Sequence, residues 1–196
     1  MTADVWSAQW RVGDVTSRVT LLGATGTEVY TLETYPIDRA VVTAEHPPCR
    51  SLCVRRTTDA PFVAVWNAWE DTPNLVEAAR SEDNPTAIHV QTRSGEYRFL
   101  FGPGRATFRG AATLESDGFL LVASKEGGAC LVGGTFARIR EGGKGFEIKL
   151  SRPATAMVPN GKVEGPVLTW ESIQHDTRGG RDYPRGGAAV EVIVTP

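Results

Sequence analysis

Five tryptophans are the residues of this sequence whose type and spacing best fit a binding chemistry: Trp6, Trp10, Trp66, Trp69 and Trp170. A flat aromatic ring on a β-sheet can stack on the C–H face of a sugar, while neighbouring polar side chains bond its hydroxyls. If the flanking segments are strands, Trp6 and Trp10 share a face, whereas Trp66 and Trp69 point to opposite faces. Because tryptophan is highly buried on average, we expect one ring of the second pair to be core.

Arginine supplies nearly all of the 21 Lys and Arg residues, and its planar guanidinium matches carboxylate and sulfate groups in two-pronged pairs. This bias suits a uronic-acid or sulfated polysaccharide, and a compositional bias of the genome explains it equally well. Arg138 and Arg140 share a strand face, but no single cationic stripe emerges from the sequence. The predicted carbohydrate contacts are Trp66, Trp69, Asn67, Arg98 and Arg55.

Three histidines, His46, His89 and His175, have the chemistry of a general base. In the segment 87–92, alternation places His89 on the face of Ala87 and Gln91, and we expect this face to meet solvent. An enzyme would pair His89 or His175 with a tyrosine such as Tyr97 or Tyr183. The sequence lacks the GxSxG pattern of a nucleophilic serine, and we predict no catalytic residue in it.

The residues His46, Cys49 and Cys53 are the only crowded group of potential metal ligands. A structural zinc site needs four ligands held by tight turns, and no second pair of ligands follows these. We therefore predict neither a metal site nor a cofactor. The odd count of 3 cysteines excludes a disulfide framework. If the segment is extended, Cys49 and Cys53 lie too far apart to bond, and Cys53 can pair only with Cys130.

The composition is that of an ordinary globular domain, with 41% hydrophobic and 22% charged residues over 196 positions. A formal charge of −2 argues against a protein that neutralises a phosphate backbone along its surface, and the two RGG triplets read as turns. We expect no nucleic-acid partner and no membrane span. The N-terminus does not resemble a targeting signal, so the localisation is open, and is secreted or periplasmic if a leader has been removed.

Short, alternating segments rich in β-branched and aromatic residues predict strands along the whole chain. The segment 75–80 has helical propensity but reads equally well as a strand, and 188–195 is expected to close the sheet. Asp117-Gly118 and Asn160-Gly161 are the best candidates for two-residue hairpin turns. We predict one domain, 1–196, that is an all-β antiparallel β-sandwich of two packed sheets with little or no helix. The predicted strands include 18–23, 27–32, 51–56, 62–69, 87–92 and 97–101.

Several segments of the sequence, and the succession of strands that they predict, resemble a known family. They are SLCVRR, PFVAVWNAW, VEAAR and EYRFLFGPG, followed by DGFLLVASKEGGACLVGGTFARI and KLSRPATAMV. This run resembles the C-terminal β-sandwich of heparinase II/III-like polysaccharide lyases, from about residue 5 to residue 170. The resemblance implies a domain of an enzyme that β-eliminates acidic polysaccharides. It carries over no catalytic residue, because the family's catalytic groups belong mainly to a helical toroid that this sequence does not contain.

The expected function is that of a non-catalytic carbohydrate-binding or accessory domain in the breakdown of an acidic polysaccharide or oligosaccharide. One alternative is a polysaccharide lyase or glycoside hydrolase active on its own. Another is a structural domain that packs on a catalytic partner, which would be marked by a large exposed apolar sheet face.

Overall fold

The computed structural model describes residues 5–34, 49–59, 61–81, 83–158, 168–169 and 192–195. These residues form fifteen strands and no helix, and every strand pair is antiparallel, which confirms the predicted all-β class. Segment 75–80 is a strand. Among the described residues no helix has the length and apolar character to cross a membrane. The strands are β1 Val5–Val12, β2 Val15–Leu22, β3 Thr27–Thr34, β4 Cys49–Arg56, β5 Val63–Trp69, β6 Leu75–Arg80, β7 Ala87–Thr92, β8 Glu96–Phe101, β9 Gly104–Phe108, β10 Ala112–Ser116, β11 Leu120–Ser124, β12 Ala129–Glu141, β13 Lys144–Val158, β14 Leu168–Thr169 and β15 Val192–Thr195.

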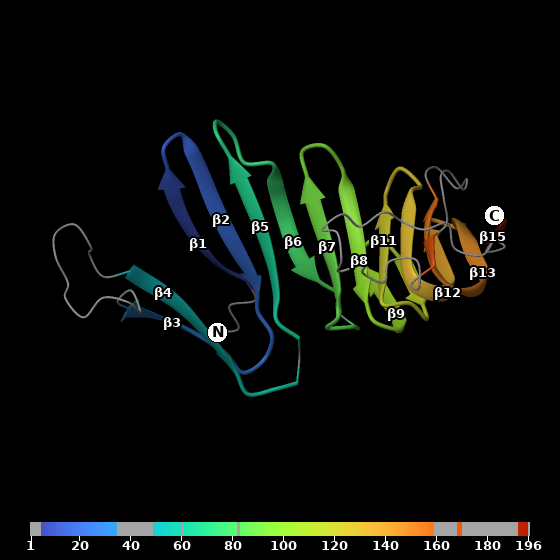
Figure 1. Cartoon of the computed structure of the whole chain (residues 1–196), viewed down its shortest axis with the longest axis horizontal. Coiled ribbons are helices and arrows are strands. Elements are labelled where there is room, and N and C mark those ends of the chain that lie inside the picture. The colour runs from blue at the N-terminus through green and yellow to red at the C-terminus, as the bar shows by residue number, and fades with distance from the viewer. Residues whose placement is uncertain are drawn as a thin grey trace, which may run out of the picture.

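The two long strands β12 and β13 each belong to both layers of a sandwich. The first residues of β12, 129–132, pair with β11, whereas residues 137–140 pair with β10. The first layer therefore contains β6, β7, β8, β11 and the adjoining halves of β12 and β13. The second layer contains β9, β10, the other halves of β12 and β13, and β15. One bent sheet thus supplies the predicted sandwich (Figure 1).

The bend in β12 lies at Gly133 and Gly134, beside the connection Asp117-Gly118 between β10 and β11. A Cβ atom on Gly134 would lie 2.6 Å from the Cα of Gly118, so only glycine permits this close approach. The Asp117 carboxylate accepts hydrogen bonds of 2.8 Å from the backbone amides of Thr135 and Phe136. The prediction of a hairpin turn at Asp117-Gly118 is wrong, because β10 and β11 both pair with β12 and the turn passes from one layer to the other.

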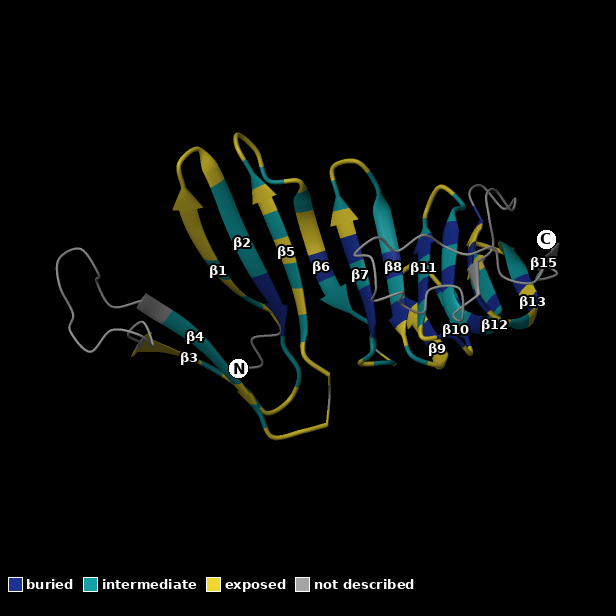
Figure 2. Cartoon of the chain, in the orientation of Figure 1, coloured by how far each residue is buried: buried dark blue, intermediate teal, exposed yellow. Residues whose placement is uncertain are grey.

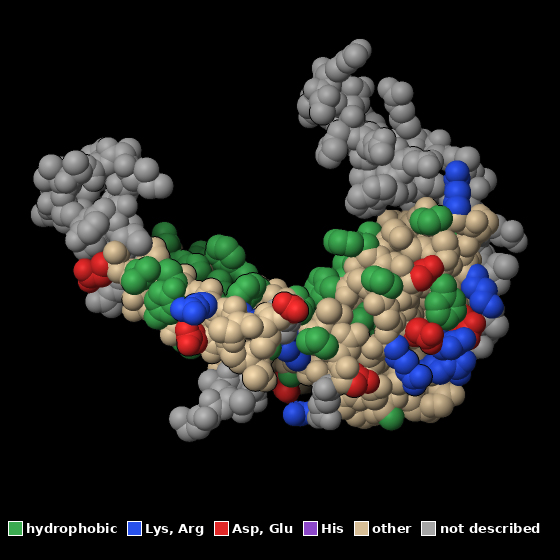
Figure 3. Space-filling view, turned by 90° about the horizontal axis from the view of Figure 1, so that it is seen from below, with side chains coloured by type: hydrophobic (Ala, Val, Ile, Leu, Met, Phe, Trp, Pro, Cys, Tyr) green, Lys and Arg blue, Asp and Glu red, His purple; other side chains and the backbone are tan. Residues whose placement is uncertain are grey.

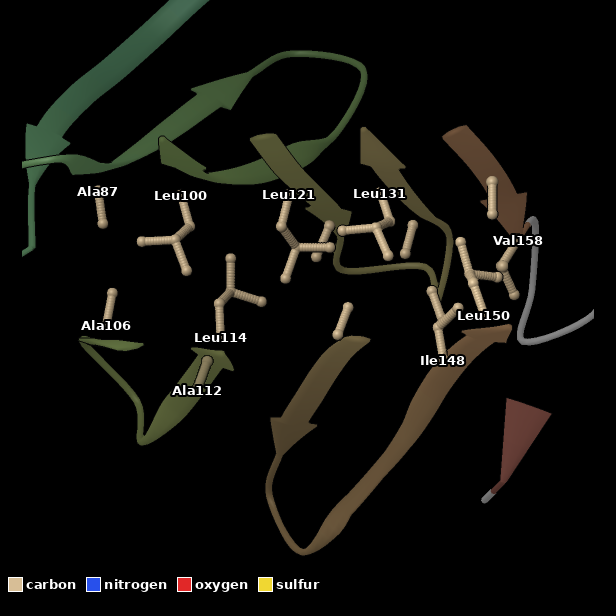
Figure 4. Packing of buried hydrophobic residues seen from close by; sticks show 14 of the residues in the cluster. Ala87, Leu100, Ala106, Ala112, Leu114, Leu121, Leu131, Ile148, Leu150 and Val158 are labelled. Atoms are coloured by element: carbon tan, nitrogen blue, oxygen red, sulfur yellow. The ribbon is translucent and has the colours of Figure 1, made fainter. Parts of the chain in front are cut away.

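The main hydrophobic core fills the space between the two layers (Figure 4). The first layer contributes Ala87, Leu100, Leu121, Leu131 and Val158, and the second layer contributes Ala106, Ala112, Leu114, Ile148 and Leu150. The many alanines bring the layers close together, while the leucines interdigitate between them. This core holds the sandwich end of the molecule.

The three strands β1, β2 and β5 form a separate sheet beside β6 (Figure 1). Its Leu22 packs with Ala78, Ile88 and Val90 of the first layer in a second, smaller core. Arg80 ties the two sheets together, because its guanidinium donates to the carbonyls of Leu22 and Gly23 at 3.2 and 3.0 Å. Val63 and Val65 of β5 pack against this smaller core, and the edge strand β1 is largely exposed (Figure 2).

Strands β3 and β4 form a two-stranded hairpin that projects from the end of the three-stranded sheet (Figure 1). Its residues are intermediate or exposed wherever they are described. Cys53 lies in this hairpin and Cys130 lies in β12, and both are free thiols. The one pairing that the sequence left open for Cys53, with Cys130, is not formed, because the two strands belong to different sheets.

Candidate functional site

The exposed face of the β1-β2-β5 sheet carries two tryptophans in contact. The Trp66 residue is 68% exposed and Trp10 is 40% exposed. Their ring centroids lie 5.6 Å apart with an interplanar angle of 66°, which is an edge-to-face contact. Strand register places them with nine small or apolar neighbours on what we call the tryptophan face: Trp6, Ala8, Val12, Val15, Ser17, Val19, Leu21, Ala64 and Ala68.

The other face of the same sheet carries Trp69 and Asn67. Both are half-buried, and the guanidinium carbon of Arg18 lies 5.1 Å from the centroid of a Trp69 ring. The amide nitrogen of Asn67 is enclosed without a hydrogen-bond partner. Trp66 and Trp69 thus face opposite ways, as their spacing predicts. The structure does not bring the predicted contact residues Trp66, Trp69 and Asn67 onto one surface, because the sheet lies between Trp66 and the other two.

Neither predicted arginine lies on the tryptophan face. Arg55 belongs to the β3-β4 hairpin, where its side chain is 67% exposed and lies 4.0 Å from the carboxylate of Glu28. Arg98 is 3% exposed in β8 and fills the interior side of the first layer. The prediction of Arg98 as a carbohydrate contact is wrong, because its guanidinium is turned inward and bound to carboxylates.

Arg98 is the centre of a polar network at one end of the sandwich. Its two terminal nitrogens donate to the Glu141 carboxylate at 2.9 and 2.8 Å, and one of them also donates to Glu96 at 2.7 Å. Glu96 accepts a further bond of 3.1 Å from Lys125. Burial by itself raises the pKa of Glu96, but the bond from Lys125 and the charge of Arg98 outweigh it and lower the pKa. Glu96 is therefore a carboxylate near neutral pH.

A pocket of about 250 Å³ opens beside this network, and we call it the His89 pocket. The Nε2 atom of His89 is enclosed and lies 3.2 Å from Glu96 Oε1, without the alignment of a hydrogen bond. The prediction of a solvent-facing His89 is wrong, because its side chain is only 22% exposed at the mouth of the sandwich. The residues that shape the pocket include Glu77, Arg80, His89, Glu96, Phe108 and Arg109.

Tyr97 does not share this pocket. It alternates with Glu96 and Arg98 along β8 and therefore points to the opposite side of the first layer, which excludes it as a partner of His89. The other predicted participants, His46, His175, Trp170 and Tyr183, lie outside the described residues, as do Asn160 and Gly161. The described residues contain no cluster of three potential metal ligands, and the side chain of Cys49 is outside them.

A second pocket, of about 490 Å³, also borders the Arg98 network. Glu141, which binds Arg98, lines it together with Lys125 and Lys144, while Ile139 and Phe146 give it an apolar wall. The network therefore contributes a side chain to each pocket, Glu96 to the first and Glu141 to the second.

The outer face of the second layer is strongly charged. Strand register aligns Arg105, Glu115, Arg138 and Glu147 in a row across β9, β10, β12 and β13. Arg138 donates to Glu147 at 2.7 Å and to Glu115 at 3.0 Å. Arg140 and Lys149 lie 3.6 and 3.7 Å from Glu147. Figure 3 shows Lys and Arg side chains interleaved with Asp and Glu over the sandwich end of the molecule. We call these six residues the charged face.

Comparison with known proteins assigns no relationship to the chain. No protein-family model, no curated protein and no solved structure matches it.

Sequence reasoning named Trp66 among the candidate contacts without showing that its ring is the exposed one, and it missed both pockets and the charged face. Each of these features is assembled from strands far apart in the chain. The only available signal was parity within single strands, which places Arg138 with Arg140 but says nothing about the strands beside them.

Proposed function

We propose that this chain is a non-catalytic carbohydrate-binding or accessory domain that acts in the breakdown of a polysaccharide. The observation that carries the proposal is the 68% exposure of Trp66 on an apolar sheet face. Tryptophan is among the largest apolar side chains, and a ring so exposed loses the burial that usually stabilises it. A ligand that covers this ring recovers that burial.

The geometry around Trp66 suits one sugar ring at a time. Ala64 and Ala68 flank it along β5, so no bulky neighbour on its own strand obstructs the approach to the indole. Trp10 meets Trp66 edge to face and forms a wall instead of extending a flat platform. A pyranose can stack its C–H face on one indole and rest an edge against the other.

The charged face supports a preference for acidic chains. It holds four cations, Arg105, Arg138, Arg140 and Lys149, against two carboxylates. Guanidinium groups bind uronate and sulfate groups in two-pronged pairs. The excess of positive charge on this face, in a chain whose formal net charge is −2, gives an anionic polymer a local site of attraction.

Affinity electrophoresis of the full chain in gels that contain neutral, uronic-acid or sulfated polysaccharides tests the proposal. We expect retardation that Trp66→Ala reduces about tenfold in affinity, which corresponds to ~1.4 kcal/mol. The matched control is Phe119→Ala, because Phe119 is 70% exposed but lies outside the tryptophan face. Equal retardation of the Trp66→Ala variant and the unaltered chain would refute the role of the tryptophan face.

The same assay separates the acidic preference from stacking. Arg138→Gln and Arg140→Gln should weaken retardation by uronic-acid and sulfated chains while leaving neutral chains unaffected. A parallel reading of absorbance at 235 nm detects unsaturated products, and its growth would establish the alternative of a lyase that acts on its own.

Packing on a catalytic partner is a second candidate, and the apolar character of the tryptophan face favours it. Ten of the eleven side chains on that face are apolar, with Ser17 as the exception, so few groups are available to bond sugar hydroxyls. Exposed apolar faces of this kind mark interaction surfaces in general. If no polysaccharide retards the chain and Trp66→Ser improves its solubility, the docking role replaces the carbohydrate role.

A further inference from the structure

We propose that the His89 pocket is a separate binding site for a single neutral polyhydroxyl unit, such as a terminal pyranose, held through two adjacent hydroxyls. The pocket lies between the first layer and the end of β9, and no residue that shapes it belongs to the tryptophan face. Binding in the His89 pocket therefore does not depend on ligand binding at Trp66.

Two of the charged groups in the pocket already form hydrogen bonds with other parts of the protein. Arg80 donates to the backbone carbonyls of Leu22, Gly23 and Pro61 and to that of Pro85. Glu96 binds Arg98 and Lys125. These groups build the wall of the pocket: the N–H groups of Arg80 are engaged by backbone carbonyls, and the charge of Glu96 is offset by Arg98 and Lys125.

Two other charged groups remain accessible. The guanidinium of Arg109 and the carboxylate of Glu77 lie 3.9 Å apart, with side chains that are 84% and 48% exposed. At that separation and exposure the ion pair contributes little to stability. It does place a strong donor next to a strong acceptor on the rim of the pocket.

This pair matches adjacent hydroxyls. A hydroxyl both donates and accepts, so one can donate to Glu77 while its neighbour accepts from Arg109. The two side chains cancel in charge, which favours a neutral ligand over an oxyanion that the Glu77 carboxylate would repel. Phe108 and Ala79 add an apolar surface for the C–H groups of a ring.

His89 supplies the third contact. Its Nε2 faces Glu96 Oε1 at 3.2 Å, and an N–H on Nε2 is the form in which this approach is favourable. In the neutral ring with its N–H on Nε2, the other ring nitrogen, Nδ1, is an acceptor for a ligand hydroxyl. His89 is a binding residue in this proposal, and no reaction is assigned to it.

Nuclear magnetic resonance of the full chain with labelled histidine provides the test. We expect millimolar methyl glycosides of neutral pyranoses to shift the His89 ring resonances in a saturable way. Glu77→Gln and Arg109→Gln should each weaken that binding at least fivefold, and the exposed side chains make both variants safe for folding. The matched controls are Glu70→Gln and Arg11→Gln, which alter exposed charges outside the pocket.

Three results would overturn the inference. The first is the absence of any shift at His89. The second is equal binding by the Glu77→Gln and Arg109→Gln variants. The third is saturable binding of inorganic phosphate or a uronate in preference to the neutral glycoside, which would make the pocket an oxyanion site. Trp66→Ala should leave the ligand-induced His89 shifts unchanged. A failure of the His89-pocket inference can therefore be distinguished from a failure of carbohydrate binding at the tryptophan face.

Discussion

The guanidinium of Arg98 in β8 donates two hydrogen bonds, of 2.9 and 2.8 Å, to the carboxylate of Glu141 at the end of β12. The two residues belong to opposite layers of the sandwich, so this ion pair joins the layers where the hydrophobic core ends. Glu96 holds the same guanidinium from its own layer. These three side chains form a polar network that connects the two layers and borders both pockets.

Loss of the Arg98 guanidinium should destabilise the chain strongly. Arg98→Ala leaves Glu96 and Glu141 close together without their shared cation, and we expect a loss of about 3 kcal/mol. This is the low end of the range for buried pairs, because the Glu141 side chain is 37% exposed. Urea unfolding measures the change. Lys125→Ala, at a site 59% exposed, is the control and should cost less than about 1 kcal/mol.

A methyl group at Gly134 should disrupt the corner of the sheet. The added Cβ would lie 2.6 Å from Gly118 Cα and 2.8 Å from Gly118 N, and backbone atoms cannot rotate away. We expect Gly134→Ala to cost about 3 kcal/mol or more, as overpacking of a rigid site does. Gly13→Ala is the comparison, because φ is +60° there and an added Cβ meets no atom within 4 Å. That variant should show only the backbone strain of about 1 kcal/mol. Equal thermal midpoints for the two variants would contradict the role of close approach.

The Asp117 carboxylate at this corner should also make the stability of the folded chain depend on pH. Burial by itself raises the pKa of Asp117, but hydrogen bonds from the Thr135 hydroxyl and from the amides of Phe136 and Thr135 outweigh it and lower the pKa below 3.8. A carboxyl with a lowered pKa stabilises the folded state fully above its unfolded pKa. That stability is lost as the pH falls through the folded pKa. Asp117→Asn should therefore destabilise the chain near neutral pH and reduce the further loss of stability as the pH falls below about 4, the ordinary pKa of an aspartate, as measured by urea midpoints. An unchanged acid dependence in this variant would assign it to other carboxylates.

Trp66 and Leu100 should differ sharply as contributors to stability. Leu100 is 0% exposed in the main core, and Leu100→Ala should cost about 2–5 kcal/mol. Trp66 is 68% exposed, and Trp66→Ala should change the free energy of unfolding by less than about 1 kcal/mol. Thermal unfolding of both variants compares them directly. A large loss in Trp66→Ala would mean that its ring is structural, and the proposed binding role would lose its basis.

The strands and their faces were predictable because alternation is a local property. The period of two along 87–92 places Ile88 and Val90 on one face, and the structure packs both in the smaller core. The same reasoning correctly separated Trp66 from Trp69. It could not say which of the two is exposed, because that depends on which face of the three-stranded sheet meets β6 and β7.

The error at Arg98 shows where local reasoning ends. A charged side chain is expected at the surface unless it is paired. Its main partner, Glu141, lies 43 residues away in the sequence, and no local pattern links the two. The same holds for His89, whose exposure is set by β8 and by the end of β9.

The all-β class, the antiparallel pairing, most strand positions and the opposite orientation of Trp66 and Trp69 could be derived from the sequence, because these follow from a backbone that alternates its side chains. The three-dimensional arrangement was needed to show that Asp117-Gly118 is a corner, that Arg98 is buried, and that Arg105, Arg138 and Lys149 share one outer face. Those features depend on strand register and layer packing, which join residues distant in the chain through contacts that no single segment contains.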